Sequence, residues 1–300
     1  MVRTFSQLYL DARKTFMLRE DVSTAGLFAR NLICSVTKMT HEQFLTHRDE
    51  MATEEQAAAM DFAVSRVLQG EPLAYVLGQW DFYGMTLCLD KNVLIPRDDT
   101  CAVTDLAVSQ ALFLGKSPRI LDLCTGSGCI GLAIAKRVQD ARVTLADISP
   151  QALAIAKKNA TMHKLTGRVS SLQVNALEVP SAFLGKFDMI VSNPPYITTR
   201  EMEELPHSVK DYEPHLALHG GEDGLAFYRA IAKNFSAALK PGGYLCFEFG
   251  MGQGDDVCRI LEENGYEVLE RTRDYNDRER AVIARYHRKE DENGNEKDCL

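Results

Sequence analysis

Apolar residues recur at helical spacing over the first part of the chain. Phe5, Leu8 and Ala12 show this spacing, which predicts packed helices through residues 1–72. Residues 53–56, Thr-Glu-Glu-Gln, form a capping box that begins one of these helices. The region holds no catalytic constellation, so we expect residues 1–74 to form a small helical domain for substrate recognition or packing.

The hydrophobic period changes to two between residues 75 and 97. This alternation predicts a β-hairpin that turns at Tyr83 and Gly84 and links two domains. An extended stretch follows and ends at Arg97. An arginine there can pair with an anion or carboxylate, or it can be solvated, and spacing alone leaves both open.

Buried apolar runs then alternate with helical segments, a pattern typical of a doubly wound α/β domain. The runs are residues 119–123, 142–147, 168–174, 187–192 and 244–249. Two further strands, near 266–271 and 280–285, are joined by so short a connection that the last strand should run antiparallel. We therefore predict a seven-stranded, Rossmann-like sheet.

Helix boundaries in this domain follow from capping residues. Ser149 and Pro150 are a typical N-cap and first helical residue. Another helix should follow Asp223 and end at the sequence Lys-Pro-Gly-Gly, residues 240–243. The predicted domain extends over residues 98–287, and the charged residues 288–300 are expected to be a flexible tail.

Composition limits the environment and the partners. The chain has a net charge of −8. It therefore lacks the basic stripe of residues expected of a nucleic-acid binder. Its eight cysteines include no CxxC pair, which favours reduced thiols. No apolar stretch approaches the ~20 residues of a membrane span, and the N-terminal residues do not resemble a secretory signal. We expect a cytoplasmic protein that contacts no membrane.

The loop after the first buried strand is rich in small residues. The sequence from Gly126 to Gly131 fits G-x-G-x-x-G, and Asp147 ends the next strand. Glycines at a helix start admit a phosphate or nucleoside close to backbone N–H groups, and the acid can accept from ribose hydroxyls. We predict an adenosine-containing cofactor, the alternative being a structural tight turn. These features alone do not separate a nicotinamide dinucleotide from S-adenosylmethionine.

The strand at 187–192 ends in Asn193-Pro194-Pro195-Tyr196. Consecutive prolines force the chain out of the sheet in a stiff loop, at the edge where α/β sheets bind ligands. The Asn193 amide, the Pro194 carbonyl and the Tyr196 ring suit a planar group that bears NH2. The alternative is a simple strand terminator.

Together these features favour a methyltransferase. An antiparallel last strand is expected with S-adenosylmethionine and not with nicotinamide, and no residue stands out as the acid or base that hydride transfer needs. His207, His215 and His219 lie in the following loop. His215 and His219 are four residues apart but not on a predicted helix, and no cysteine joins them, so we expect no metal site.

Over nearly its whole length the chain resembles the HemK/PrmC-type protein-(glutamine-N5) methyltransferases, which modify the Gly-Gly-Gln motif of peptide chain release factors. The matching stretches are residues 70–75 (GEPLAY), 93–97 (VLIPR), 125–128 (TGSG), 193–196 (NPPY), 212–214 (YEP), 220–224 (GGEDG) and 273–277 (RDYND). Adenine-N6 DNA methyltransferases share the Asn-Pro-Pro-Tyr loop but not the flanking stretches.

The resemblance implies roles for particular residues. S-adenosyl-L-methionine would be held by Cys124, Thr125, Gly126, Ser127, Gly128, Asp147, Ala176 and Asn193. The substrate amide would be gripped by Asn193, Pro194, Pro195 and Tyr196, among which Asn193, Pro194 and Tyr196 would be catalytic. Cys124 replaces the usual first glycine of the loop, and Asn175-Ala176 replaces an acidic residue followed by an aromatic or leucine.

Residues 198–222 lack clear periodicity, which is unusual inside a compact domain unless the segment is functional. We predict that this segment closes over or docks the protein substrate. Two other interpretations remain: an N6-adenine nucleic-acid methyltransferase, and a cofactor-binding module without activity.

Overall fold

The computed structural model describes residues 3–287, so the tail predicted at 288–300 lies outside the described residues. The chain divides into two compact units. One comprises the described residues up to Trp80, with Leu89–Lys91 and Pro206–Glu213. The other comprises Asp81–Cys88, Asn92–Leu205 and the described residues from Pro214 onward. The predicted domain boundaries at 74 and 97 stay predictions.

The first unit is helical, as its periodicity predicted. Its N-terminal helices are α1 (Phe5–Phe16), α2 (Val22–Thr37), α3 (His41–His47), α4 (Glu54–Leu68) and α5 (Leu73–Leu77). The predicted capping box of Thr53 and Gln56 is present, and similar boxes begin α1 and α3. The core lies where the apolar faces meet, with Phe5, Leu8, Phe16, Leu32, Ile33 and Met60 all buried.

A short segment from much later in the chain belongs to this helical unit. It contains α10 (His207–Lys210). The Tyr212 hydroxyl donates a 3.0 Å hydrogen bond to the carbonyl oxygen of Gln69. A Cβ on Gly70 would lie 2.9 Å from Nδ1 of His207, so glycine permits the close approach. The segment therefore packs on the end of α4.

The second unit is built on the predicted seven-stranded sheet, with strand order β5-β4-β3-β6-β7-β9-β8. The strands are β3 (Arg119–Leu123), β4 (Arg142–Asp147), β5 (Val169–Gln173), β6 (Phe187–Ser192), β7 (Leu239–Glu248), β8 (Tyr266–Arg273) and β9 (Glu279–Tyr286). The strands from β5 to β7 pair in parallel, and β9 pairs antiparallel with β7 and β8. The predicted antiparallel last strand is confirmed.

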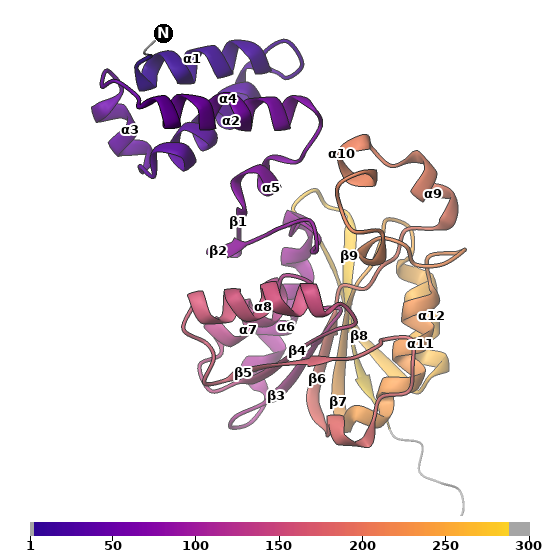
Figure 1. The fold of residues 1–300 in the computed structure, drawn as a ribbon. Coiled ribbons are helices and arrows are strands. Elements are labelled where there is room, and N and C mark those ends of the chain that lie inside the picture. The colour runs from indigo at the N-terminus through magenta and orange to yellow at the C-terminus, as the bar shows by residue number, and fades with distance from the viewer. Residues whose placement is uncertain (1–2, 288–300) are drawn as a thin grey trace, which may run out of the picture. The chain divides into compact units, whose positions relative to one another are not determined.

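Helices cover both faces of this sheet (Figure 1). One face packs against α6 (Cys101–Phe113), α7 (Cys129–Arg137) and α8 (Pro150–Met162), and the other against α11 (Ala226–Asn234) and α12 (Gly254–Glu263). Alternate residues of β3 serve the two cores: Ile120 faces the first, whereas Leu121 and Leu123 face the second. Burial on both faces explains why these strands are continuous apolar runs.

The hairpin, β1 (Gln79–Phe82) and β2 (Met85–Cys88), forms where it was predicted. Tyr83 and Gly84 have φ values of 50° and 71°, the left-handed pair of a type I′ turn. The extended pattern predicted from residue 75 begins only at Gln79, because residues 73–77 form α5.

The predicted strand at 244–249 begins earlier. The helix after Asp223 ends at Asn234, the 3-10 turn η4 (Phe235–Ala238) follows, and β7 begins at Leu239. A register shift opposite β6 lets the Pro-Gly-Gly sequence lie inside the strand. The other 3-10 turns are η1 (Asp98–Thr100), η2 (Ala182–Leu184) and η3 (His215–Ala217). Residues 198–222 hold short helical turns, including α9 (Thr199–Glu204).

Candidate active site

Two loops leave adjacent parallel strands at the same edge of the sheet. Leu123 at the end of β3 pairs with Ser192 at the end of β6. The Ser192 hydroxyl donates a 2.6 Å hydrogen bond to the Leu123 carbonyl oxygen. Cys124 and Asn193 therefore leave the sheet side by side. The strand order reverses direction here, which is where α/β sheets bind ligands.

The loop after β3 turns through left-handed backbone conformations. Cys124 has a φ of 60° and Gly126 a φ of 53°. A Cβ built on Gly126 would meet nothing within 4 Å, so this backbone faces open space. The Gly126 N–H donates a 2.9 Å hydrogen bond to Oδ2 of Asp147 at the end of β4. The predicted cofactor acid is therefore brought to the predicted glycine loop.

The same loop is fixed from beneath by Asp122. Its Oδ2 accepts from the Thr125 hydroxyl at 2.5 Å and from the Gly131 N–H at 2.8 Å. Burial raises the pKa of Asp122 to about 7, although these two donors oppose the rise. Within residues 3–287 its Oδ1 has no hydrogen-bond partner. Asp122 thus organises the loop from a fully buried position.

Two further glycines serve packing. A Cβ on Gly131 would lie 2.4 Å from Cδ2 of Leu145, and one on Gly128 would lie 3.1 Å from Cδ1 of Leu132. The final glycine of the pattern therefore lets α7 lie directly against the sheet, as in dinucleotide-binding loops.

These residues fit an adenosine-containing cofactor. Gly126 offers open backbone just before α7, Asp147 ends the neighbouring strand, and Thr125 and Ser127 are buried within the loop. Burial raises the pKa of Asp147. Ala176, which follows β5, is buried in the same apolar cluster against which Cys124 packs. The structure thus gathers the predicted cofactor residues at one edge, while their contacts with a cofactor stay predictions.

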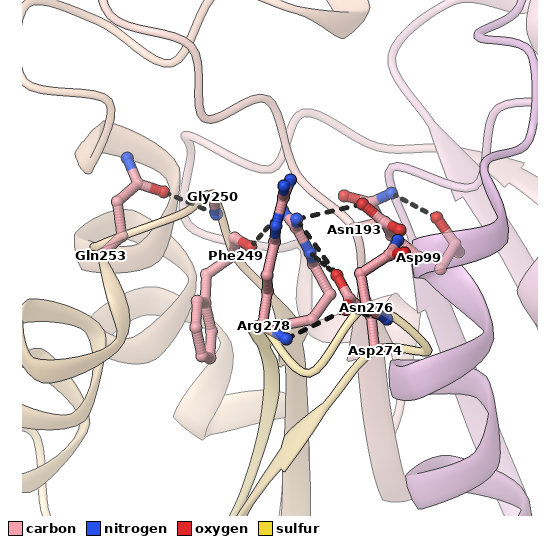
Figure 2. Close-up of polar contacts among 10 residues, drawn as sticks. Asp99, Asn193, Phe249, Gly250, Gln253, Asp274, Asn276 and Arg278 are labelled. Carbon is pink, nitrogen blue, oxygen red and sulfur yellow. Dashed lines mark hydrogen bonds and ion pairs between the residues drawn. The ribbon is translucent and has the colours of Figure 1, made fainter.

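The loop after β6 is held on its inner side. Pro194 and Pro195 are buried, and Asn193 and Tyr196 are partly buried. Asn193 Nδ2 donates a 3.3 Å hydrogen bond to Oγ1 of Thr100 in η1 (Figure 2). The sequence pattern did not predict Thr100 as a partner, because it lies 93 residues earlier.

A glycine-rich segment packs tightly against this loop. A Cβ on Gly220 would lie 2.7 Å from the Pro195 carbonyl oxygen, and one on Gly224 would lie 2.3 Å from the Tyr196 carbonyl oxygen. Gln253 Nε2 donates to that Tyr196 oxygen at 3.1 Å, while its Oε1 accepts from the Gly250 N–H at 2.9 Å (Figure 2). The Gly-Gly-Glu-Asp-Gly stretch therefore supports the Asn-Pro-Pro-Tyr loop.

Sequence reasoning missed a buried ion cluster behind the loop. Arg280 on β9 contacts Asp99 at 3.0 Å and Asp274 at 3.4 Å, and its Nη1 donates to the Phe249 carbonyl oxygen at 3.3 Å. Asp274 also accepts from the backbone N–H groups of residues 276 and 278. The sequence signal available for this cluster was an arginine inside a predicted strand, together with acidic residues in two loops.

Sequence reasoning also missed Glu248, the last residue of β7. It is 1% exposed, and burial raises its pKa to about 7. An acidic residue at the carboxyl end of a buried strand was the signal for this one.

The three histidines after the motif are divided between the two units. His207 belongs to the helical unit, whereas His219 Nε2 lies 3.0 Å from the Thr199 hydroxyl. Across residues 3–287, no group of three or more His, Cys, Asp or Glu side chains is arranged to hold a metal ion. Over the same residues, no helix is long and apolar enough to cross a membrane.

Two family models match the chain. One, described as a methyltransferase small domain, matches residues 104–210. The other, described as the PrmC N-terminal domain, matches residues 8–78.

Relatives match over much of their length. A release factor glutamine methyltransferase of Clostridium acetobutylicum is 42% identical over 213 residues, which are 71% of this chain and 74% of that protein. Another, of Geobacter sulfurreducens, is 35% identical over 278 residues, covering 92% of this chain and 95% of that one.

Solved structures share the fold. A methyltransferase of Pyrococcus furiosus has a TM-score of 0.50 and 16% identity, covering 74% of this chain and 97% of its own. The catalytic domain of hMettl16, solved with an RNA hairpin, has a TM-score of 0.54 and 13% identity, covering 81% and 86%. At such low identity these two indicate the fold alone.

Proposed function

The chain belongs to the family of release factor glutamine methyltransferases, and on that premise we propose that it methylates the side-chain amide nitrogen of the Gly-Gly-Gln glutamine in a peptide chain release factor. The methyl donor would be S-adenosyl-L-methionine. One observation supports this most directly: the strand register sets Asn193 beside the glycine loop that begins at Cys124.

The residues of the chain divide the work between the two loops. Gly126, with Asp147 accepting its N–H, would hold the cofactor, which supplies an electrophilic methyl group on a sulfonium. Asp147 at the end of β4 would accept hydrogen bonds from the ribose hydroxyls of the cofactor. The Asn-Pro-Pro-Tyr loop would hold the acceptor.

An amide nitrogen is a poor nucleophile because its lone pair is delocalised into the carbonyl. The Asn193 side-chain oxygen and the Pro194 carbonyl oxygen would each accept one substrate N–H, which draws electron density toward nitrogen and fixes its direction. Partly buried Tyr196 would wall the site and exclude water. Orientation and fixed dipoles would supply most of the rate enhancement.

A methyl-transfer assay tests the proposal. Purified protein would receive S-adenosylmethionine with a tritiated methyl group and one of three acceptors: a release factor, its Gly-Gly-Gln glutamine-to-alanine variant, or duplex DNA. Label should enter only the intact release factor. Label in DNA, or undiminished label in the glutamine variant, would overturn the proposal.

A substitution at Asn193 tests whether this residue holds the substrate amide. Asn193→Ala should abolish transfer while changing cofactor affinity only moderately, as measured by titration calorimetry. Asn264→Ala is the control, because the Asn264 side chain donates to the Ile260 carbonyl oxygen at 2.8 Å at the end of α12 and should leave transfer near wild type. Equal activity of Asn193→Ala and wild type would contradict the assigned grip.

A further inference from the structure

A buried carboxylate lies directly behind the predicted substrate amide grip. Glu248 ends β7, the strand next to β6 in the sheet. Hydrogen bonding from the side chains of Thr100 and Asn193 lowers the pKa of Glu248 against the larger rise that burial causes. Its Oε2 has no partner among the described residues. Such a charge is expensive to bury without a role, and the two-loop mechanism does not use it.

The donors and acceptors in this cluster admit one consistent arrangement. An ionised carboxylate only accepts hydrogen bonds, and a threonine hydroxyl has one hydrogen to give. If Thr100 donates that hydrogen to Glu248, its Oγ1 must accept from Asn193, as the 3.3 Å contact with Nδ2 requires. The second Nδ2 hydrogen would then go to Glu248, whose pKa is lowered by hydrogen bonding from Asn193. Both Nδ2 hydrogens are then used.

This arrangement decides which way the Asn193 amide points. The two ends of an asparagine amide have nearly the same shape, so only its hydrogen-bond partners distinguish them. With Nδ2 held inward by two acceptors, Oδ1 is the atom left for an incoming N–H. A substrate amide needs this acceptor, and a reversed Asn193 would present it with a donor instead.

We propose that Glu248, acting with Thr100, is a positioning residue that fixes the Asn193 side chain with its carbonyl oxygen toward the substrate amide. The inference rests on the proposed function, because it assigns the purpose of Asn193. Glu248 itself is buried, so it would act on the substrate only through Asn193.

The cluster predicts a pH dependence. A protonated Glu248 carries an O–H donor. Because this donor can pair with Oδ1 of Asn193, Nδ2 no longer has to face Glu248. Because burial raises its pKa to about 7, with Arg280 opposing and Asp99 adding to the rise, methyl transfer should weaken as pH falls through neutrality. The other titratable groups that interact with Glu248 are Tyr196, Tyr228, Cys101 and Cys129.

Glu248→Gln tests the role while keeping the side-chain shape. Its NH2 can donate to Asn193 and stabilise the reversed amide, so kcat for the release factor should fall by about tenfold or more. The acid limb of the kcat profile between about pH 6 and 8 should flatten. Cofactor affinity, measured by calorimetry, should stay within about twofold of wild type.

A threonine pair supplies a second test that does not depend on Glu248→Gln folding. Thr100→Val removes the hydroxyl and should lower kcat, whereas Thr100→Ser keeps it and should restore most of the rate. Thr104→Val is the control, because the equally buried Thr104 donates only to the Thr100 backbone carbonyl, at 2.8 Å, and should leave kcat near wild type.

The outcomes separate this inference from the function on which it rests. If wild type does not methylate the release factor glutamine, the proposed function fails. If wild type is active but Thr100→Val and Thr100→Ser have equal rates, or a folded Glu248→Gln keeps the wild-type kcat and pH profile, the positioning role is overturned.

Discussion

The Ser192 hydroxyl donates a 2.6 Å hydrogen bond to the carbonyl oxygen of Leu123, joining the last residues of β6 and β3. The cofactor loop begins one residue after Leu123, and the Asn-Pro-Pro-Tyr loop begins one residue after Ser192. Ser192 is fully buried. Its bond to Leu123 therefore helps to set the spacing between the two predicted ligand-binding loops.

Removal of this bond should affect activity more than folding. Ser192→Ala should lower the free energy of unfolding by about 1 kcal/mol, the usual net worth of one hydrogen bond. Because both loops then lose their common anchor, kcat should fall severalfold. Urea denaturation and the methyl-transfer assay measure the two effects. Ser170→Ala is the control, since the Ser170 hydroxyl contacts Thr144 near the edge of the sheet, at 3.3 Å; an equal loss of kcat there would refute the anchor.

Alanine substitutions at two glycines distinguish an effect on cofactor binding from an effect of backbone strain. Gly126 and Gly84 both have positive φ values, 53° and 71°, and a Cβ on either meets nothing within 4 Å. Alanine at each should therefore cost about 1 kcal/mol of stability. Only Gly126→Ala places a methyl group on the predicted cofactor surface, so it alone should weaken S-adenosylmethionine binding, by about tenfold or more. Calorimetry decides; equal affinities in the two variants would place the cofactor elsewhere.

Most of the sheet could be predicted because local signals agree with the final fold. The strands at 119–123, 142–147 and 187–192 were predicted to the residue, since each is a buried run that ends at a loop-forming sequence. The early start of β7 could not be predicted, because a proline and two glycines normally end an element and only the register shift beside β6 accommodates them.

The candidate site could be predicted in its loops but not in its supports. The small residues from Thr125 to Gly128 and the sequence at 193–196 are local patterns with a physical meaning. Thr100 and Glu248 reach Asn193 only through tertiary packing, and no local spacing encodes such a contact. The same holds for the pairing of Arg280 with Asp99.

The pKa of Asp122 makes a prediction about stability. Burial raises it to about 7 from an ordinary value of 3.8. The folded state therefore binds more protons than the unfolded chain between these pH values, and the contribution of Asp122 to stability falls as pH rises through that window. Asp122→Asn cannot titrate, so its Tm relative to wild type should rise between about pH 5 and pH 8. A constant difference in Tm between Asp122→Asn and wild type over this range would contradict the burial argument.

Arg280 should be essential to the second unit. Arg280→Met leaves Asp274, with 1% of its side chain exposed, without its cation, and breaking a buried pair typically costs about 3–5 kcal/mol. Arg259→Met removes an exposed pair with Asp256 and should cost less than about 1 kcal/mol. Chemical denaturation compares them. A similar small loss in both would show that the buried cluster contributes no more than a surface pair.

The last prediction concerns residues 206–213, which come much later in the chain than the N-terminal helices but belong to the helical unit. The Tyr212 hydroxyl donates to the Gln69 carbonyl oxygen at 3.0 Å, so Tyr212→Phe should loosen residues 206–213. Loss of about 1 kcal/mol there corresponds to roughly fivefold faster amide exchange, which hydrogen-exchange mass spectrometry resolves. Because we predict that residues 198–222 dock the substrate, KM for the release factor should rise while cofactor affinity stays unchanged.

Tyr266→Phe is the matched control for that change. The Tyr266 hydroxyl donates to the Ala232 carbonyl oxygen at 3.2 Å, so its loss should speed exchange in α11 and leave residues 206–213 protected. If Tyr212→Phe exchanges faster at 206–213 yet keeps the wild-type KM, the segment is anchored as described but does not contribute to substrate docking.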